Sequence, residues 1–462
     1  MAAPGHYLRT CIAWAFYDWA NSAFALIFMA AVFPFFYQAM VERSLAAETG
    51  SAQVRVEAPP PAGEEEAAAV DPAASRGMAY WGFTAGIAVA LIALLAPIFG
   101  SVSDRSRSRK KFLALFALVG MAGCVGAAFV PAESWLLASL FYIVGDVGFA
   151  GSIVFYDALL PHFARPRDLD RISTAGYALG YLGGGVLLAL NLWWITCPGD
   201  WGMPDGDFAI RVSFLSVALW WGLFTIPLLL WVPEPEAAPG GGKERGWAAL
   251  TAGFRQLAAT AGKLRRYKVA ILFLVAFWLY ADGVGTVQKM AGTYGKAIGF
   301  DRDNLITALL LTQFFGVPCA FAYGWAARWI GAKRAVLLGL VVFMLICTGA
   351  YFMQNVTHFY ILALAVGAVQ GGVQGLSRSL YAGIIPRRLS GEFFAFFSVM
   401  SKFAGFLGPI LFGWLALGAS RLPILAVGVL FLVGGVLLLL TDIDQGRRAA
   451  AAEDRAWGEG EG

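Results

Sequence analysis

The sequence predicts an all-α membrane protein with twelve transmembrane helices, and both its composition and its apolar segments indicate this fold. Of the 462 residues, 59% are hydrophobic and only 14% are charged. A soluble globular protein has roughly 45–50% apolar and about 25% charged residues. The proportions found here exclude a water-soluble enzyme and a disordered chain. The net charge of +4 is too small to indicate a nucleic-acid partner.

The apolar segments are long enough to cross a bilayer. A spanning helix needs about 20 apolar residues, because each residue adds about 1.5 Å against a hydrocarbon core of about 30 Å. Lipid offers no hydrogen-bond partner to the backbone, so we expect each segment to be helical. The twelve segments are 11–38, 78–100, 111–131, 134–156, 174–196, 209–232, 268–290, 304–326, 333–352, 358–384, 391–417 and 422–441.

The distribution of Lys and Arg predicts the orientation of these spans. The loops after the even-numbered spans carry about 20 of these residues, and the opposite loops carry about eight. Cytoplasmic loops are the ones enriched in Lys and Arg, so both termini are expected in the cytoplasm. We expect the chain in the inner (plasma) membrane of a bacterium.

The two halves of the chain resemble each other. The segment at 156–161 (YDALLP) recurs at 381–386 (YAGIIP), and Gly180 in the fifth span corresponds to Gly405 in the eleventh, at the same offset. We therefore expect two parallel six-helix repeats that enclose a central cavity. Residues 41–77 are rich in Ala, Pro and Glu and are expected to form a disordered external loop. The expected organisation is an N-terminal half (1–232), a cytoplasmic linker (233–266), a C-terminal half (267–442) and a cytoplasmic tail (443–462).

Five charged residues lie within the predicted spans. They are Asp18, Asp146, Asp282, Arg378 and Lys402. A charge at the centre of a bilayer costs about 2.5–3.5 kcal/mol and normally faces a cavity or a partner. Counted from the cytoplasmic ends, Asp18 and the two cations share one layer, whereas the other two acids lie further out. Two interpretations stay open: a substrate site, or ion pairs that only fix helix packing.

Polar residues accompany these charges at helical spacing. In the tenth span Gln370, Gln374 and Arg378 follow one another at intervals of four, and Asn21 lies near Asp18 in the first span. An arginine or lysine would bind a substrate carboxylate, and an aspartate would exchange a proton. The candidates for substrate binding and coupling are Asp18, Asn21, Asp282, Gln370, Gln374, Arg378 and Lys402.

Other chemistry has little support in the sequence. The five Cys form no C-x-x-C pair, and the three His lie near span ends or in loops, so no metal site or cofactor is expected. No phosphate-binding G-x-x-x-x-G-K-[ST] segment is present, so ATP is not the expected energy source. The chain is therefore not expected to be an enzyme.

The segment at 100–111 (GSVSDRSRSRKK) resembles the motif between spans 2 and 3 of the major facilitator superfamily. The resemblance implies that Gly100, Asp104 and Arg105 belong to a cytoplasmic gate. The second-half copy has Arg328 in place of the acid, so no matching latch is expected there.

Four further segments resemble one branch of that superfamily, which is related to the fungal vacuolar amino-acid effluxers. They are 17–24 (YDWANSAF), 176–184 (GYALGYLGG), 279–286 (LYADGVGT) and 374–380 (QGLSRSL). The resemblance implies transport, with amino-acid efflux as the activity of the fungal relatives.

The expected function is secondary active transport of a small solute by alternating access, with protons as the coupling ion. The expected partners are a small-molecule substrate such as an amino acid, protons and the lipid bilayer, and the protein is expected to be a monomer. Two alternatives stay open. One is an exporter of drugs or other apolar compounds, and the other is a non-transporting lipid scramblase or assembly factor.

Overall fold

A computed structural model describes residues 4–48, 80–81, 83–92, 94–95, 108–235, 267–297, 302–404 and 422–459. All regular elements in these ranges are helices, as the sequence predicts. Nine of the helices in the described part are long and apolar enough to cross a membrane, or ten if the bent pair near the C-terminus counts as one span. The second and eleventh predicted spans are described only in part, so the number twelve stays a prediction.

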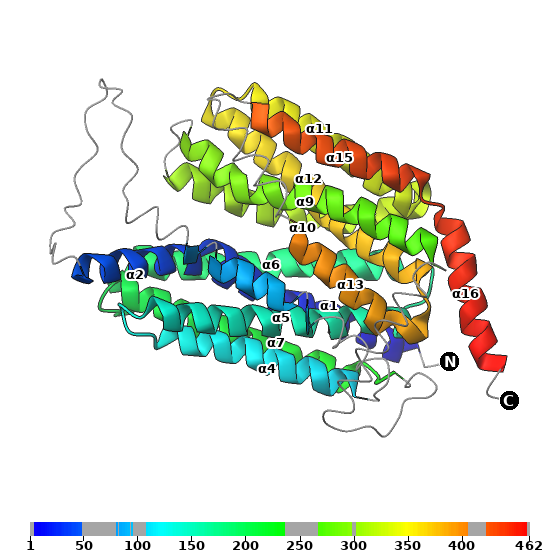
Figure 1. Ribbon diagram of the computed structural model, residues 1–462, viewed down its shortest axis with the longest axis horizontal. Coiled ribbons are helices and arrows are strands. Elements are labelled where there is room, and N and C mark those ends of the chain that lie inside the picture. Colours follow the sequence, from blue (N-terminus) through cyan, green and yellow to red (C-terminus); the bar gives the residue numbers. More distant parts are fainter. Residues whose placement is uncertain are drawn as a thin grey trace.

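The helices form two groups that lie side by side (Figure 1). The first group contains α1 (Pro4–Ala23), the π-helix η1 (Phe24–Ala31), α2 (Phe33–Glu48), α4 (Arg109–Ala128), α5 (Trp135–Phe163), α6 (Leu169–Thr196), the short η2 (Pro198–Trp201) and α7 (Gly206–Trp231). The second contains α9 (Lys268–Ala297), α10 (Arg302–Ile330), α11 (Ala332–Tyr351), α12 (Val356–Ile384), the short η3 (Arg387–Leu389), α13 (Ser390–Phe403), α15 (Leu422–Leu440) and α16 (Ile443–Glu459). The groups meet where α6 packs on α10 and α12 and where α13 packs on α5.

Several helices extend beyond the predicted spans. Helix α2 continues to Glu48, so the first residues of the expected external loop at 41–77 are helical, and the rest of that loop lies outside the described residues. Helix α5 continues to Phe163 with Pro161 in its last turn, although the sequence placed its end at 156. A proline near a helix end removes only one backbone hydrogen bond, so it does not end the helix before it. The expected cytoplasmic tail forms α16.

Two lysines, one in each group, bond to the last carbonyl groups of α7 and α15. Lys110 Nζ donates to the carbonyl oxygens of Leu229 (2.9 Å) and Val232 (2.7 Å), at the end of α7. Lys333 Nζ donates to those of Leu439 (2.9 Å) and Thr441 (2.8 Å), at the end of α15. The last carbonyls of a helix have no partner within the helix, and a cation there is stabilising. The two lysines therefore make the same kind of contact in both groups.

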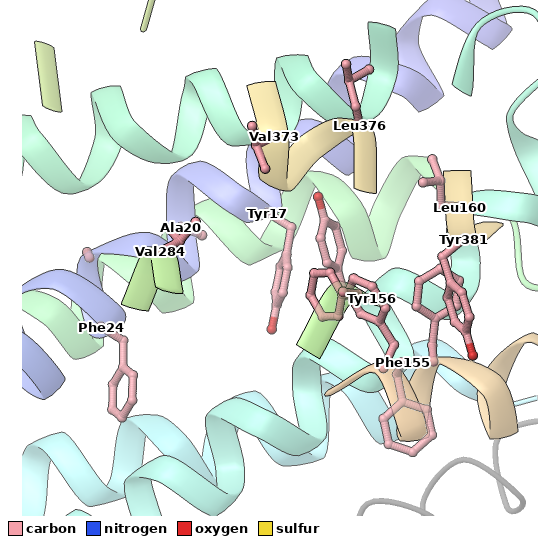
Figure 2. Packing of buried hydrophobic residues seen from close by; sticks show 14 of the residues in the cluster. Tyr17, Ala20, Phe24, Phe155, Tyr156, Leu160, Val284, Val373, Leu376 and Tyr381 are labelled. Atoms are coloured by element: carbon pink, nitrogen blue, oxygen red, sulfur yellow. The ribbon is translucent and has the colours of Figure 1, made fainter. Parts of the chain in front are cut away.

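Buried side chains of both groups form one continuous apolar cluster. Tyr17 of α1, Phe155 and Tyr156 of α5 and Tyr381 of α12 all belong to it, and Figure 2 shows them within the interior. Tyr17 and Tyr156 are in contact, with ring centroids 4.8 Å apart. These residues pack around the polar site described below.

Helices α4 and α5 approach each other through glycine. A Cβ atom at Gly123 would lie 2.6 Å from Cα of Gly145, which is far closer than van der Waals contact. Small residues at such positions allow helix backbones to pack closely in a membrane. The pair therefore tolerates no side chain at Gly123.

The substitution Gly123→Ala should destabilise the protein by about 1–3 kcal/mol, because the added methyl group forces the two backbones apart. A lower midpoint of thermal unfolding in detergent would show this. Gly199→Ala is the matched control, because a Cβ there meets no atom within 4 Å. Equal midpoints for the two variants would contradict the packing argument.

Candidate functional site

Arg378 of α12 joins the two groups of helices through buried ion pairs. Its Nη2 atom lies 2.9 Å from Oδ2 of Asp18 on α1, and its Nη1 atom lies 3.2 Å from Oδ1 of Asp157 on α5. The three side chains are almost fully buried. Both aspartates belong to the first group of helices and the arginine to the second, so these pairs bridge the interface.

Ser173 of α6 completes the coordination of the guanidinium. Arg378 Nε donates to Ser173 Oγ at 2.8 Å, and Nη2 donates to the Ser173 carbonyl at 2.9 Å. Ser173 Oγ in turn donates to the carbonyl of Gly375 on α12 at 2.7 Å. We refer to Arg378, Asp18, Asp157 and Ser173 as the Arg378 cluster.

Aromatic rings surround the guanidinium. Its Cζ atom lies 4.5 Å from the ring centroid of Tyr177 and 4.8 Å from that of Trp14. The ring of Tyr156 is 5.5 Å away and stacks on Trp14. A cation is attracted to the face of an aromatic ring, most strongly where water is excluded. The rings thus help to hold the charge of Arg378 in an apolar interior.

The Arg378 cluster contains one more carboxylate than it has cations. With all groups ionised, Asp18, Asp157 and Arg378 carry a net charge of −1. An uncompensated charge in a buried site is strongly unfavourable. One proton on either carboxyl group makes the cluster neutral, so its composition suits the uptake and release of one proton.

Gly176 of α6 provides the space for the ion pair. A Cβ atom there would contact the carboxylate of Asp18 and lie 2.9 Å from Nη2 of Arg378. One turn further along, a Cβ at Gly180 would lie 2.5 Å from Ser22 Oγ. Helix α6 can therefore lie close against α1 because it presents glycine to the cluster.

The structure brings together some of the predicted site residues. Asp18 and Arg378, which the sequence places in one layer, form an ion pair. Gln374, one turn before Arg378, accepts a hydrogen bond from Tyr181 of α6 at 3.0 Å. Asn21 and Gln370 are also buried, and each has a side-chain atom without a hydrogen-bond partner among the described residues, Nδ2 and Oε1 respectively.

The remaining predicted residues are not among the described contacts of Arg378. Asp282 of α9 is completely buried, and Asp146 precedes Asp157 by eleven residues on α5, about 16 Å along the axis. Neither is among the described hydrogen-bond partners of Arg378. For Lys402 the structure describes only the backbone, within α13. The predicted gate residues Gly100, Asp104 and Arg105 lie outside the described residues.

Asp157 is the functional candidate that the sequence interpretation missed. It lies one residue beyond the predicted end of the fourth span, so the sequence interpretation did not count it among the charges within the spans. A comparison of the two similar segments could have drawn attention to it, because Asp157 of the YDALLP segment corresponds to Ala382 in the YAGIIP segment. An acid found in only one of two similar segments marks a position at which the two halves differ.

A second polar contact joins the groups near the end of α5. His162 Nε2 lies 3.0 Å from Ser390 Oγ at the start of α13, and it also contacts Arg109 of α4. Ser390 Oγ also lies 3.1 Å from the carbonyl of Ala158, to which it donates. This contact lies at the end of the bundle where both termini are found (Figure 1).

Replacing Arg378 with Met should destabilise the protein by about 3–5 kcal/mol, because two buried carboxylates lose their cation. The variant that also carries Asp18→Asn and Asp157→Asn has no buried charge left in the cluster and should recover most of this loss. Thermal unfolding in detergent compares the two. If the single variant were as stable as the wild type, the ion pairs would not bridge the helix groups.

Solved structures share this fold. The human organic anion transporter MFSD10 superposes with a TM-score of 0.70 at 15% identity, over 95% of this chain and 100% of that one. The proton:xylose symporter XylE has a TM-score of 0.65 at 14% identity, over 94% of each chain. FucP in its outward conformation also has a TM-score of 0.65, at 10% identity, over 94% of this chain and 98% of that one. XylE and FucP are major facilitator superfamily proteins, and the fold described here is of that class.

The sequence comparison identifies the branch. Residues 8–451 match the family described as vacuole effluxer Atg22-like, and the chain belongs to this family. The MFS-type transporter YxiO of Bacillus subtilis is 34% identical over 94% of this chain and 96% of its own. Autophagy-related protein 22 of Coccidioides immitis is 23% identical over 80% of this chain and 73% of its own. The protein is thus a multi-pass membrane transporter and not an enzyme, and the resemblance found in the sequence is confirmed.

Proposed function

We propose that the protein is a secondary active transporter that moves an amino acid or a similar small zwitterion by alternating access, coupled to protons. The Arg378 cluster is the observation that carries this proposal. It is buried, it lies between the two groups of helices, and it contains one cation and two carboxyl groups. Each of these features matches a requirement of coupled transport.

Alternating access requires contacts that hold one side closed and can be broken. Asp170 on α6 accepts a hydrogen bond from Ser379 on α12 at 2.5 Å, on the same side as the contact between His162 and Ser390. That side is the cytoplasmic one in the predicted orientation. These contacts support a conformation closed to the cytoplasm, and the fold is similar to that of FucP in its outward conformation.

Protonation provides a way to weaken the bridge. An Asp18 or Asp157 that takes up a proton loses its charge attraction to Arg378, so the groups of helices are held together less strongly. A proton gradient would therefore bias the equilibrium between the two conformations. The surplus carboxylate in the cluster supports proton coupling.

The chemistry of the cluster also suits a zwitterion. Arg378 can accept a substrate carboxylate in place of an aspartate, since a guanidinium binds carboxylates through two parallel hydrogen bonds. The displaced aspartate would then face the ammonium group. Trp14, Tyr156 and Tyr177 would contact an apolar side chain. Efflux is the direction that the Atg22-like family description suggests.

Proton coupling is tested in proteoliposomes loaded with radiolabelled leucine. An imposed gradient of one pH unit should drive leucine to a concentration ratio of up to about tenfold across the membrane for each coupled proton, since that gradient is worth about 1.4 kcal/mol per proton. Asp157→Asn should lose this accumulation and keep leucine–leucine exchange, because an amide still bonds to Arg378 but takes up no proton.

Asp200→Asn is the control for this experiment, because Asp200 is exposed in η2 and lies outside the cluster. If leucine flux through the wild type did not change when the pH gradient was collapsed, proton coupling would be refuted. A protein that scrambles labelled lipid and moves no leucine would refute transport of amino acids and favour the scramblase alternative.

Substrate class is tested by thermal unfolding in detergent with a panel of amino acids, peptides and apolar drugs. A ligand present at about 100 times its Kd should stabilise the native state by about 2.7 kcal/mol. An amino acid should raise the wild-type midpoint and have much less effect on Arg378→Lys, which keeps the charge but loses the two parallel hydrogen bonds.

Arg448→Ala, an exposed position on α16, is the matched control and should respond as the wild type does. Stabilisation by apolar drugs alone, equal in all three proteins, would contradict an Arg378-bound carboxylate. That result would favour export of drugs or other apolar compounds.

A further inference from the structure

A second candidate binding site lies outside the Arg378 cluster, at the end of the bundle where both termini are found. A cavity of about 530 Å³ opens between the turn from α10 to α11 and the bend of 57° from α15 to α16. Its lining includes Lys333, Arg334, Leu380, Leu440, Asp444 and Arg447. Transport through the centre of the protein does not use this cavity.

Two of the three cations in the cavity are available to a ligand. Lys333 is already bonded to the end of α15 through its ammonium group. Among the described residues, the ion pair of Arg447 is a long contact of 3.7 Å with Asp444, and both side chains are at least half exposed. Asp170 on α6 also interacts electrostatically with Arg447. Arg334 is exposed and lines the same cavity. Two guanidinium groups thus face one space with little acidic compensation.

The acidic residues in the lining do not neutralise these arginines. Asp442 accepts a hydrogen bond from the backbone N–H of Gln445 at 2.9 Å, so its carboxylate is engaged at the start of α16. Asp444 is 82% exposed and points its charge largely into solvent, where screening is strong. An anion in the cavity would therefore meet a net positive field.

The surface next to the cavity is of the kind that faces lipid. Leu440 in its lining is 68% exposed, and Trp329 on the adjoining end of α10 is 76% exposed. Exposed tryptophan and leucine beside arginine and lysine mark the boundary between hydrocarbon and lipid headgroups. The cavity thus has a charged interior and an apolar rim at the level of the headgroups.

We infer that this cavity binds the phosphate-bearing headgroup of an anionic lipid of the cytoplasmic leaflet. Arginine pairs with phosphate through two parallel hydrogen bonds, and basic pockets between helices at this level suit anionic headgroups. The exposed leucines accommodate the acyl chains, which free phosphate does not have. Leu380, two residues after Arg378 on α12, lies in the cavity wall, so the bound lipid contacts the helix that carries the central arginine.

The test compares lipid-induced stabilisation of the detergent-purified protein with phosphatidylglycerol, phosphatidylcholine and inorganic phosphate. Phosphatidylglycerol should raise the midpoint of thermal unfolding of the wild type by several degrees, and phosphatidylcholine should have little effect. The double variant Arg334→Ala/Arg447→Ala should lose at least half of this rise. Lys333 is left intact, because its removal would free the carbonyls at the end of α15.

Arg448→Ala is the matched control, because it removes one exposed arginine from α16 that does not line the cavity. Each increase in the unfolding midpoint is measured relative to the same variant without lipid, so a general loss of stability does not affect the result. Native mass spectrometry provides a second readout, with fewer retained phosphatidylglycerol molecules expected for the double variant. The proposal would be overturned if the double variant and the control retained equally many phosphatidylglycerol molecules and showed equal increases in the unfolding midpoint. It would also be overturned if inorganic phosphate raised the midpoint as much as phosphatidylglycerol does.

Discussion

The bond of Arg378 to Asp18 and Asp157 is the interaction on which the rest of the interior depends. A guanidinium and two carboxylates so deeply buried are stable only when each charge has its partners. The close approach of α6 at Gly176, the hydrogen bonds from Arg378 to Ser173 and the surrounding aromatic rings all meet that requirement. Because the arginine and the aspartates come from different groups of helices, the same bonds hold the groups together.

This arrangement joins binding to movement. The groups can separate at the cluster only if the charge of Arg378 finds another partner or an aspartate is neutralised. In the proposed function, a substrate carboxylate supplies the first and a proton the second, so both would act on one site. Further contacts reinforce the bridge, between Ser379 and Asp170 and between His162 and Ser390.

Much of the fold could be predicted because hydropathy is a local property of the chain. The apolar segments locate the helices, and their all-helical character follows from the lack of backbone partners in lipid. Helix ends were less well predicted, because they depend on packing as well as on composition. The end of α5 shows the consequence: the predicted span ends at residue 156, the helix continues to Phe163, and Asp157 was therefore not counted among the buried charges.

The sequence by itself determined that the protein spans a membrane, that charged residues lie inside it, and that Asp18 and Arg378 occupy one layer. These conclusions need only residue type and distance along a helix axis. Which acid meets the arginine was decided by the tertiary structure. It depends on how each helix is rotated about its axis and which helices are neighbours. Packing across the whole bundle sets both, and it turns Asp18 and Asp157 toward Arg378.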